Sequence, residues 1–417
     1  MFVDLSPFRH KNFRRLFLGQ LISAFGTQMT AVVIPFQIFL ITKSTLYTGL
    51  ISGVEFIFIF FSSLLGGVLA DRFEKRKILI WAEVGLSIIP LGLALNSLSA
   101  QPHLGIIFVL AAMASFLGGI HRPALEALTP RLVSENEIAK ISVLLPIRHI
   151  LTMILSPMIG GFAMVSVGAF YTYLFDAVSF FISLLFLLGV NYKKINTNKE
   201  IIKTQTILEE IQEGYRYIRS RKEIFSSYAS DFIVMVLCNP VALYPALAAA
   251  FQQEKSVGLL YAFPSVGALL MTLTSRWTLS CQRYGVFIIC AGAFWSLSLA
   301  IVGLSPGFNL ILFGLFTAGF FDMVSGVFRT TLWNETIPET IRGRIAGFEM
   351  LGYMSGPLLG NALLGFLADF LGVQAALFWG ALCSLILLAL FNFCIPALWK
   401  YKKSHHIEQK LSLRKSS

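Results

Sequence analysis

Apolar runs of about 20 residues recur along this 417-residue chain, and they limit its possible folds more strongly than any other feature. A helix needs about 20 apolar residues to cross a hydrocarbon core of roughly 30 Å. Lipid cannot hydrogen-bond an exposed backbone, and the runs lack the two-residue alternation of barrel strands, so they predict helices. Twelve runs occur, at residues 16–41, 46–70, 78–97, 103–125, 141–167, 170–190, 227–251, 256–275, 284–304, 308–332, 345–368 and 374–397. We therefore predict an all-α membrane protein with twelve transmembrane helices.

The positions of the positive charges predict its orientation. The formal net charge of +11 would suggest nucleic-acid binding in a soluble protein. Here, however, all but five of the 33 Lys and Arg residues fall in alternate loops and in the two tails. Lys43 and Lys255 lie in the opposite loops, and Arg122, Arg148 and Arg329 lie within runs. Because basic loops stay in the cytoplasm, we predict a multi-pass membrane protein with both termini cytoplasmic, whose charges meet the lipid bilayer and no nucleic acid.

One long polar interruption divides the chain into two halves. It separates six runs from six, and its apolar residues recur at helical spacing, which predicts an amphipathic helix on the membrane surface; they are Ile207, Leu208, Ile211, Tyr215 and Ile218. The predicted domains are an N-terminal six-helix bundle at 1–190, a cytoplasmic linker at 191–226, a C-terminal six-helix bundle at 227–399 and a basic cytoplasmic tail at 400–417.

The two halves are related in sequence. The stretch "GIHRPALEALTP" at 119–130 matches "GVFRTTLWNETIP" at 326–338, which places Arg122 opposite Arg329. Shortly afterwards, "SPMIGG" at 156–161 corresponds to "GPLLGN" at 356–361. Six-helix repeats with binding between them are typical of secondary transporters, whose halves move about a central site. The sequence thus predicts two pseudo-symmetric six-helix halves.

The polar stretch "GGVLADRFEKRKI" at 66–78 interrupts the apolar pattern between the second and third runs. Its glycines permit close helix packing, and its charges can reach lipid phosphates or acidic groups of the other half. We interpret it as a gate that helps to close the inner face, with Gly67, Asp71, Arg72, Glu74 and Arg76 as its residues. The alternative is that these charges only fix the orientation of the chain in the membrane.

These residues resemble the G-x-L-A-D-R-x-G-R-R-x-x-L signature of the major facilitator superfamily, and the resemblance covers the whole chain. Glu74 replaces the usual second glycine, and "ADRFEKRK" is similar to the acidic variant of bacterial enterobactin exporters. "STLYTGL" at 44–50, "LYPALA" at 243–248 and "IPETIRGRIAGF" at 337–348 also resemble those exporters. Related drug:proton antiporters share some of these elements.

The resemblance implies the major facilitator fold, a location in the bacterial inner membrane and secondary active efflux of a small molecule. It favours proton-coupled export of an enterobactin-like siderophore, with the proton gradient as energy source and no cofactor. A multidrug or macrolide proton antiporter is the first alternative, followed by a siderophore importer or a lysophospholipid transporter. We expect a monomer, with an outer-membrane channel system as a candidate partner.

Ionisable residues inside predicted spans are functional candidates, because buried charge is costly in a membrane. Glu55 and Asp322 lie near mid-membrane and are the predicted proton carriers, unless they are structural carboxyls. We expect Arg329 to extend toward the membrane surface, and Glu83 to contact either the gate or the substrate. The remaining candidates for substrate contact or charge relay are Arg148, Arg122, Glu126, Asp231, Tyr244 and Glu349, with Arg122 and Glu126 spaced to pair with each other.

The fifth span carries a predicted switching element. Pro157 removes a backbone donor, while Gly160 and Gly161 permit close approach of a neighbouring helix, so this span could bend and slide. By contrast, the sequence contains no phosphate-binding G-x-x-x-x-G-K-[ST] motif and no Cys/His cluster with zinc spacing. We therefore predict no enzyme, no ATP-driven pump and no metal site.

Overall fold

The computed structural model describes residues 6–134, 137–191, 215–337 and 339–402. It describes the backbone alone at residues 64, 68, 70–72, 139, 142, 143, 146, 147, 149, 150, 154 and 339–353. The predicted linker helix falls largely on 192–214, outside the described residues, so the domain boundaries there stay a prediction.

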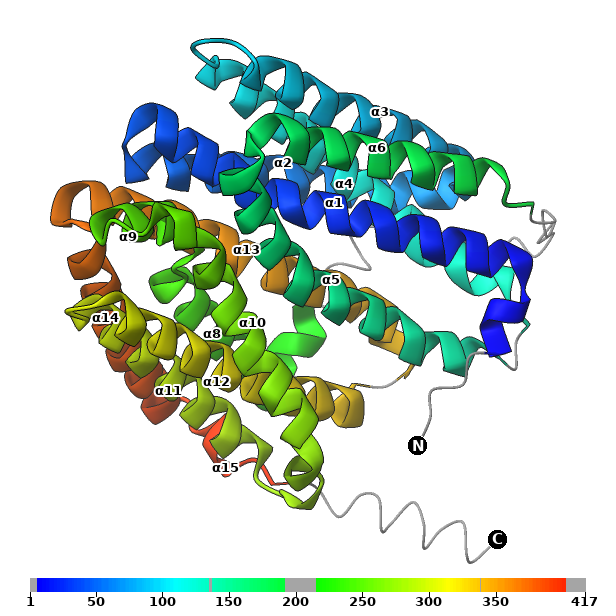
Figure 1. Ribbon diagram of the computed structural model, residues 1–417. Helices are drawn as coiled ribbons and strands as arrows, with labels where there is room; N and C mark the ends of the chain where they lie inside the picture. Colours follow the sequence, from blue (N-terminus) through cyan, green and yellow to red (C-terminus); the bar gives the residue numbers. More distant parts are fainter. Residues whose placement is uncertain (1–5, 135–136, 192–214, 338, 403–417) are drawn as a thin grey trace, which may run out of the picture.

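Within the described residues, the first half consists of six long helices (Figure 1). They are α1 (Lys11–Thr42), α2 (Thr45–Arg72), α3 (Lys75–Ser97), α4 (Leu104–Leu128), α5 (Ile138–Ser166) and α6 (Gly168–Leu188). Each covers most or all of one predicted apolar run. Most extend beyond the run by several residues, because a helix continues into the polar interface where its charged residues reach water.

The second half repeats this pattern with one interruption. Its helices are α8 (Lys222–Cys238), α9 (Tyr244–Ala250), α10 (Val257–Thr274), α11 (Tyr284–Leu304), α12 (Phe308–Thr336), α13 (Glu339–Leu371), α14 (Val373–Cys394) and the short α15 (Ala397–Lys400). Together, α8 and α9 form the seventh span. Within the described residues, eleven helical segments are long and apolar enough to cross a membrane, and α5 has a shorter apolar stretch, Leu151–Ser166. The predicted all-α fold with twelve spans is confirmed.

Helix packing shows the pseudo-symmetry directly. In the first half, α1 packs on α6 and α5, α2 on α4, and α3 on α4 and α6. In the second half, α8 packs on α14 and α13, α10 on α12, and α11 on α12 and α14, which is the same set of pairs. The halves contact each other mainly through α2 with α13 and α5 with α10, and these two pairs are also related by the repeat.

The seventh span is broken between α8 and α9 at Asn239 and Pro240. A break inside a membrane frees backbone groups that must be satisfied within the protein. Asn361 of α13 does this, because its Oδ1 accepts bonds from the Ala242 backbone N–H at 3.1 Å and from Asn239 Nδ2 at 3.2 Å. The broken span is thereby held against α13.

The two halves meet at one end of the molecule. We call the end where α1 begins and α14 ends the terminal end, and the opposite one the far end. Close glycine contacts join the halves toward the far end: Gly49 lies against Gly365, and Gly161 against Gly258. The Ser44 hydroxyl also donates to Asp369 Oδ1 at 2.8 Å. Figure 1 shows the ribbons of the halves diverging from this end toward the terminal end. The structure is therefore closed at its far end.

Replacing Gly161 by Ala should open the far end. A Cβ there would lie 2.5 Å from the Gly258 Cα, closer than real Cβ atoms approach backbone. Overpacking of this kind costs about 1–3 kcal/mol, which would lower the closed population relative to the open one by roughly 5–150-fold. The measurement is cross-linking between Ser44→Cys and Asp369→Cys, whose parent side chains touch across the closed far end.

Gly118→Ala is the matched control for this prediction. Its added Cβ would meet no atom within 4 Å, although it also lies inside a membrane helix. Equal cross-linking yields in the Gly161 and Gly118 variants would show that the glycine contact does not hold the closed state.

Candidate transport site

A charge cluster occupies the interior of the second half. On α12, Asp322, Ser325 and Arg329 follow one another at three- and four-residue spacing, which places them on one helix face. The Arg329 guanidinium Nη1 donates to Oδ2 of Asp231, which comes from α8. Both side chains are buried, at 10% and 15% exposure. Each charge thus has a partner inside the bundle, as burial requires.

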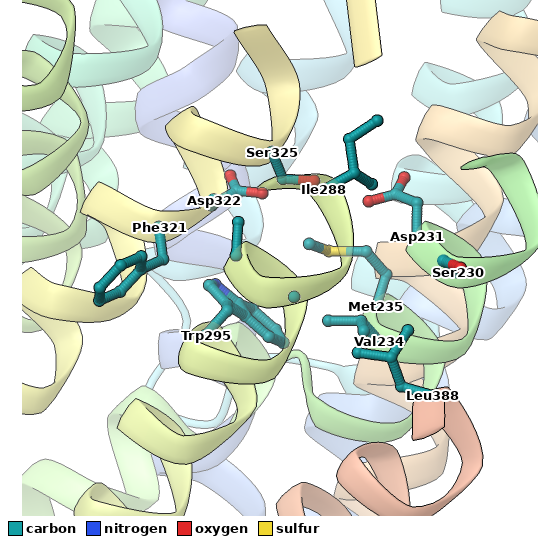
Figure 2. Close-up of a pocket in the computed structure, with 12 residues that line it drawn as sticks. Ser230, Asp231, Val234, Met235, Ile288, Trp295, Phe321, Asp322, Ser325 and Leu388 are labelled. Carbon is teal, nitrogen blue, oxygen red and sulfur yellow. The ribbon is translucent and has the colours of Figure 1, made fainter. Parts of the chain in front are cut away.

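A narrow pocket adjoins this cluster. Figure 2 shows the carboxylates of Asp231 and Asp322 on its two sides, with Ser325 beside Asp322. The other lining residues are mainly apolar and come from α8, α11, α12 and α14: Ser230, Val234, Met235, Ile288, Ala291, Gly292, Trp295, Phe321 and Leu388. The pocket has room for about a single water molecule. Its size therefore suits a proton or a water rather than a transported organic molecule.

The position of Arg329 differs from the sequence prediction. Its place near the end of the tenth apolar run predicted a side chain extended to the membrane surface. Instead it is turned inward, buried, and paired with Asp231. The physical reason is the partner: an inward guanidinium is stable once a carboxylate from another helix meets it, and sequence spacing does not show that meeting. Asp231, a predicted candidate for substrate contact or charge relay, contacts Arg329 in this structure.

The first half presents a second group of charges. Arg122 Nε donates to Glu126 Oε1 at 3.2 Å, so the predicted pairing on α4 is present. Both side chains are exposed. Arg148 on α5 lies within electrostatic range of this pair, with its guanidinium 5.8 Å from the Phe17 ring centroid. Among the side chains that the structure describes, no carboxylate forms an ion pair with Arg148. This face therefore carries a cation available to an anionic ligand.

The two predicted proton carriers lie in different halves. Asp322 lines the pocket of the second half, whereas Glu55 is half-buried on α2, in the span that packs against α13. Glu55 is not among the residues that line the pocket. The structure thus offers two separate carboxyls rather than one shared proton site.

The predicted gate forms contacts within the first half. Arg76 Nη2 donates to the Leu188 carbonyl at 2.7 Å, which joins the start of α3 to the end of α6. Glu74 forms an ion pair with Lys77 at 3.6 Å. The glycine in close contact is Gly66, against α4, while a Cβ at Gly67 would meet no atom within 4 Å. The side chains of Asp71 and Arg72 lie outside the described residues.

The other predicted residues are placed as follows. The helix α5 continues through Pro157, with Gly160 packed against Met29 of α1 and Gly161 against the other half. Tyr244 is 3% exposed and packs edge-to-face on Tyr261, with ring centroids 4.8 Å apart, and it is not among the residues that line the pocket beside Asp322. The Glu349 side chain lies outside the described residues.

Sequence reasoning missed a buried polar cluster in the first half. Glu83 of α3 contacts Gln20 of α1, His121 of α4 and Ser183 of α6. These residues come from four helices, and only the carboxylate was conspicuous inside an apolar run. In the described part of the chain, no group of three His, Cys, Asp or Glu side chains is arranged to hold a metal ion.

Two repeated six-helix halves, with buried charges in their interiors, define a multi-pass membrane transporter of the major facilitator class. Solved structures share this fold. The nucleoside transporter NupG superposes with a TM-score of 0.71 at 17% identity, covering 94% of this chain and 99% of its own. A POT family transporter in complex with 5-aminolevulinic acid also gives 0.71, at 14% identity, covering 93% and 96%. A bacterial homologue of the iron transporter ferroportin gives 0.67 at 17% identity, covering 93% and 98%.

The chain belongs to the transmembrane secretion effector family of this class, whose sequence model matches residues 3–414. It is similar to the enterobactin exporter EntS of Escherichia coli O1:K1, with 30% identity over 359 residues and 85% of each chain covered. EntS of Shigella boydii serotype 18 is 29% identical over 357 residues, again covering 85% of each chain. The protein is thus a membrane transporter, as the sequence predicted.

Proposed function

We propose that this protein is a secondary active exporter that moves a catecholate-type siderophore out of the cytoplasm in exchange for protons. The observation that carries the proposal is the similarity to enterobactin exporters, which covers 85% of both chains and therefore spans both halves. Substrate sites of such transporters lie between the halves. A similarity confined to one half would therefore support the proposed substrate less than this similarity, which spans both halves.

The charges of the first half support an anionic aromatic substrate. Arg148 combines a guanidinium with the nearby Phe17 ring, and Arg122 contributes a second cation on the neighbouring helix. A guanidinium binds carboxylate or phenolate oxygens through several donors and stacks on aromatic faces. Catechol rings that carry negative charge would meet both kinds of contact here.

The second half supports proton coupling. Asp322 lies in a pocket with room for about one water molecule, beside the Asp231–Arg329 pair. A carboxyl in such a place can take up and release a proton without exchanging other ligands. We propose Asp322 as the principal carrier and Glu55 as a second one. With the terminal end in the cytoplasm, closure of the far end corresponds to the inward-facing state, in which substrate enters.

Everted membrane vesicles provide the test. Respiration acidifies their interior, so vesicles that contain the protein should accumulate labelled enterobactin, whereas vesicles without it should not. A protonophore should abolish the accumulation. Uptake that persists after collapse of the proton gradient would contradict the proposed proton coupling. Vesicles that accumulate macrolides or dyes but do not accumulate enterobactin would identify a multidrug antiporter instead.

A further inference from the structure

Glu83 is buried inside the first half, and none of the described Lys or Arg side chains forms an ion pair with it. It is 0% exposed, and its Oε1 accepts bonds from Gln20 Nε2 at 2.5 Å and Ser183 Oγ at 3.1 Å. Its Oε2 is also buried and has no hydrogen-bond partner among the described residues. Neutral donors on one oxygen do not compensate a full negative charge in this setting.

Among the described side chains, the titratable group in contact with this carboxyl is an imidazole. His121 Nε2 of α4 lies 3.5 Å from Glu83 Oε1, and its side chain is 12% exposed. Glu83 lies eight residues after the start of α3, and His121 seven before the end of α4. At 1.5 Å per residue, both lie about 10–12 Å from the terminal ends of their helices. The two groups therefore form a pair at one depth.

The other charged groups on the adjoining helices have different partners. On α2, Glu55 lies about nine residues further from the terminal end than Glu83, or roughly 13 Å. The side chains of Asp71 and Arg72, also on α2, lie outside the described residues. Four of the other groups bond elsewhere: Arg15 to the Gly189 carbonyl, Arg76 to the Leu188 carbonyl, Arg122 to Glu126, and Asp176 to Thr30. Lys11, Arg14, Lys75 and Lys77 lie in the first turns of α1 and α3, at the terminal end. His121 is thus the group placed to share a proton with Glu83.

We propose that Glu83 and His121 form a proton-binding site inside the first half, separate from the Asp322 pocket. With one proton, the pair is neutral overall, either as a carboxylate with an imidazolium or as two neutral groups. Without that proton, it leaves one negative charge inside the bundle, where desolvation disfavours an unpaired charge. The two groups approach each other through Glu83 Oε1 and His121 Nε2.

The internal repeat gives this site a counterpart. Gln20 is the tenth residue of α1 and Asp231 the tenth of α8, and both contact an ionisable partner in their own half. His121 immediately precedes Arg122, which the repeat aligns with Arg329, the partner of Asp231. Each half therefore holds an ionisable cluster between its first and fourth helices. The role of the Glu83–His121 site in transport rests on the proposed proton coupling, but the site itself does not.

Infrared difference spectroscopy of the full chain in lipid nanodiscs tests the site without substrate. A pH titration should show a carboxyl signal that disappears in Glu83→Gln and an imidazole signal that disappears in His121→Gln. Because the groups share a proton, each substitution should also move the midpoint of the remaining signal by about one pH unit or more. Asp176→Asn, which removes another buried carboxyl of the same half, should leave both signals unchanged.

Several outcomes would overturn the proposal. They are a Glu83→Gln spectrum that loses no carboxyl signal of the unaltered protein, a His121→Gln spectrum that loses no imidazole signal, or single variants whose remaining midpoints equal the wild-type values. If Glu83→Gln does not fold, Ser183→Ala retains both titrating groups and should still move the carboxyl midpoint. Since no substrate or gradient is present, a failed siderophore assay would count against the proposed function alone.

Discussion

Replacing Asp322 by Asn should strongly reduce gradient-driven accumulation of substrate and leave exchange without a gradient intact. The amide keeps the shape of the side chain in the pocket beside Asp231 and Arg329, but it cannot bind or release a proton. Coupling free energies between sites are about 1–3 kcal/mol, so driven transport should fall roughly 5–150-fold. The comparison is between uptake into everted vesicles and counterflow in proteoliposomes at equal pH on both sides.

Two further variants make this result interpretable. Glu55→Gln tests the second carboxyl in the same assays, and partial loss there would mean that both carriers contribute. Glu254→Gln changes an exposed carboxyl in the far-end turn before α10 and should have no effect on either measurement. Normal pumping by both the Asp322 and the Glu55 variants would exclude these carboxyls as proton carriers.

Arg329→Met should destabilise the folded transporter by about 3–5 kcal/mol, because it leaves the buried Asp231 carboxylate without its cation. Replacing both partners, with Asp231→Asn and Arg329→Met, should restore most of that stability, since neither charge then remains unpaired. Thermal unfolding of the purified protein in detergent, followed by tryptophan fluorescence, measures both variants against the unaltered chain.

Arg122→Met is the matched control for the buried pair. The repeat aligns Arg122 with Arg329, but its partnership with Glu126 is exposed, and exposed helical pairs contribute about 0.3–0.5 kcal/mol. The Arg122 variant should therefore unfold near the temperature of the unaltered protein. Equal losses in the Arg122 and Arg329 variants, or no recovery in the double variant, would contradict the assignment of a buried ion pair.

The spans could be predicted from sequence because the membrane imposes one length and one polarity on every helix. The predicted run at 284–304 coincides with α11, and the run at 308–332 with most of α12, which continues to Thr336. The break between Cys238 and Tyr244 was not predicted. Its backbone groups are satisfied by Asn361, more than one hundred residues away, and no local pattern signals such a partner.

The candidate site was only partly predictable. Asp322 and Arg148 were conspicuous as charges inside apolar runs, because such charges are costly in lipid. The contacts between buried charges could not be predicted. Asp231, the partner of Arg329, lies on another helix, and the residues around Glu83 come from four helices. The repeat indicated that Arg122 and Arg329 correspond, but not that one is exposed and the other buried.

The sequence alone thus determined the membrane location, the twelve spans, the two repeated halves and the family resemblance, because hydrophobic length, loop charge and repeats are properties of the linear chain. The tertiary structure decided which charges meet. It paired Arg329 with Asp231, placed His121 beside Glu83 and closed the far end through Gly161 and Gly258. Each of these contacts joins helices that are distant in sequence, and whether a buried charge is stable depends on the side chains that surround it in three dimensions.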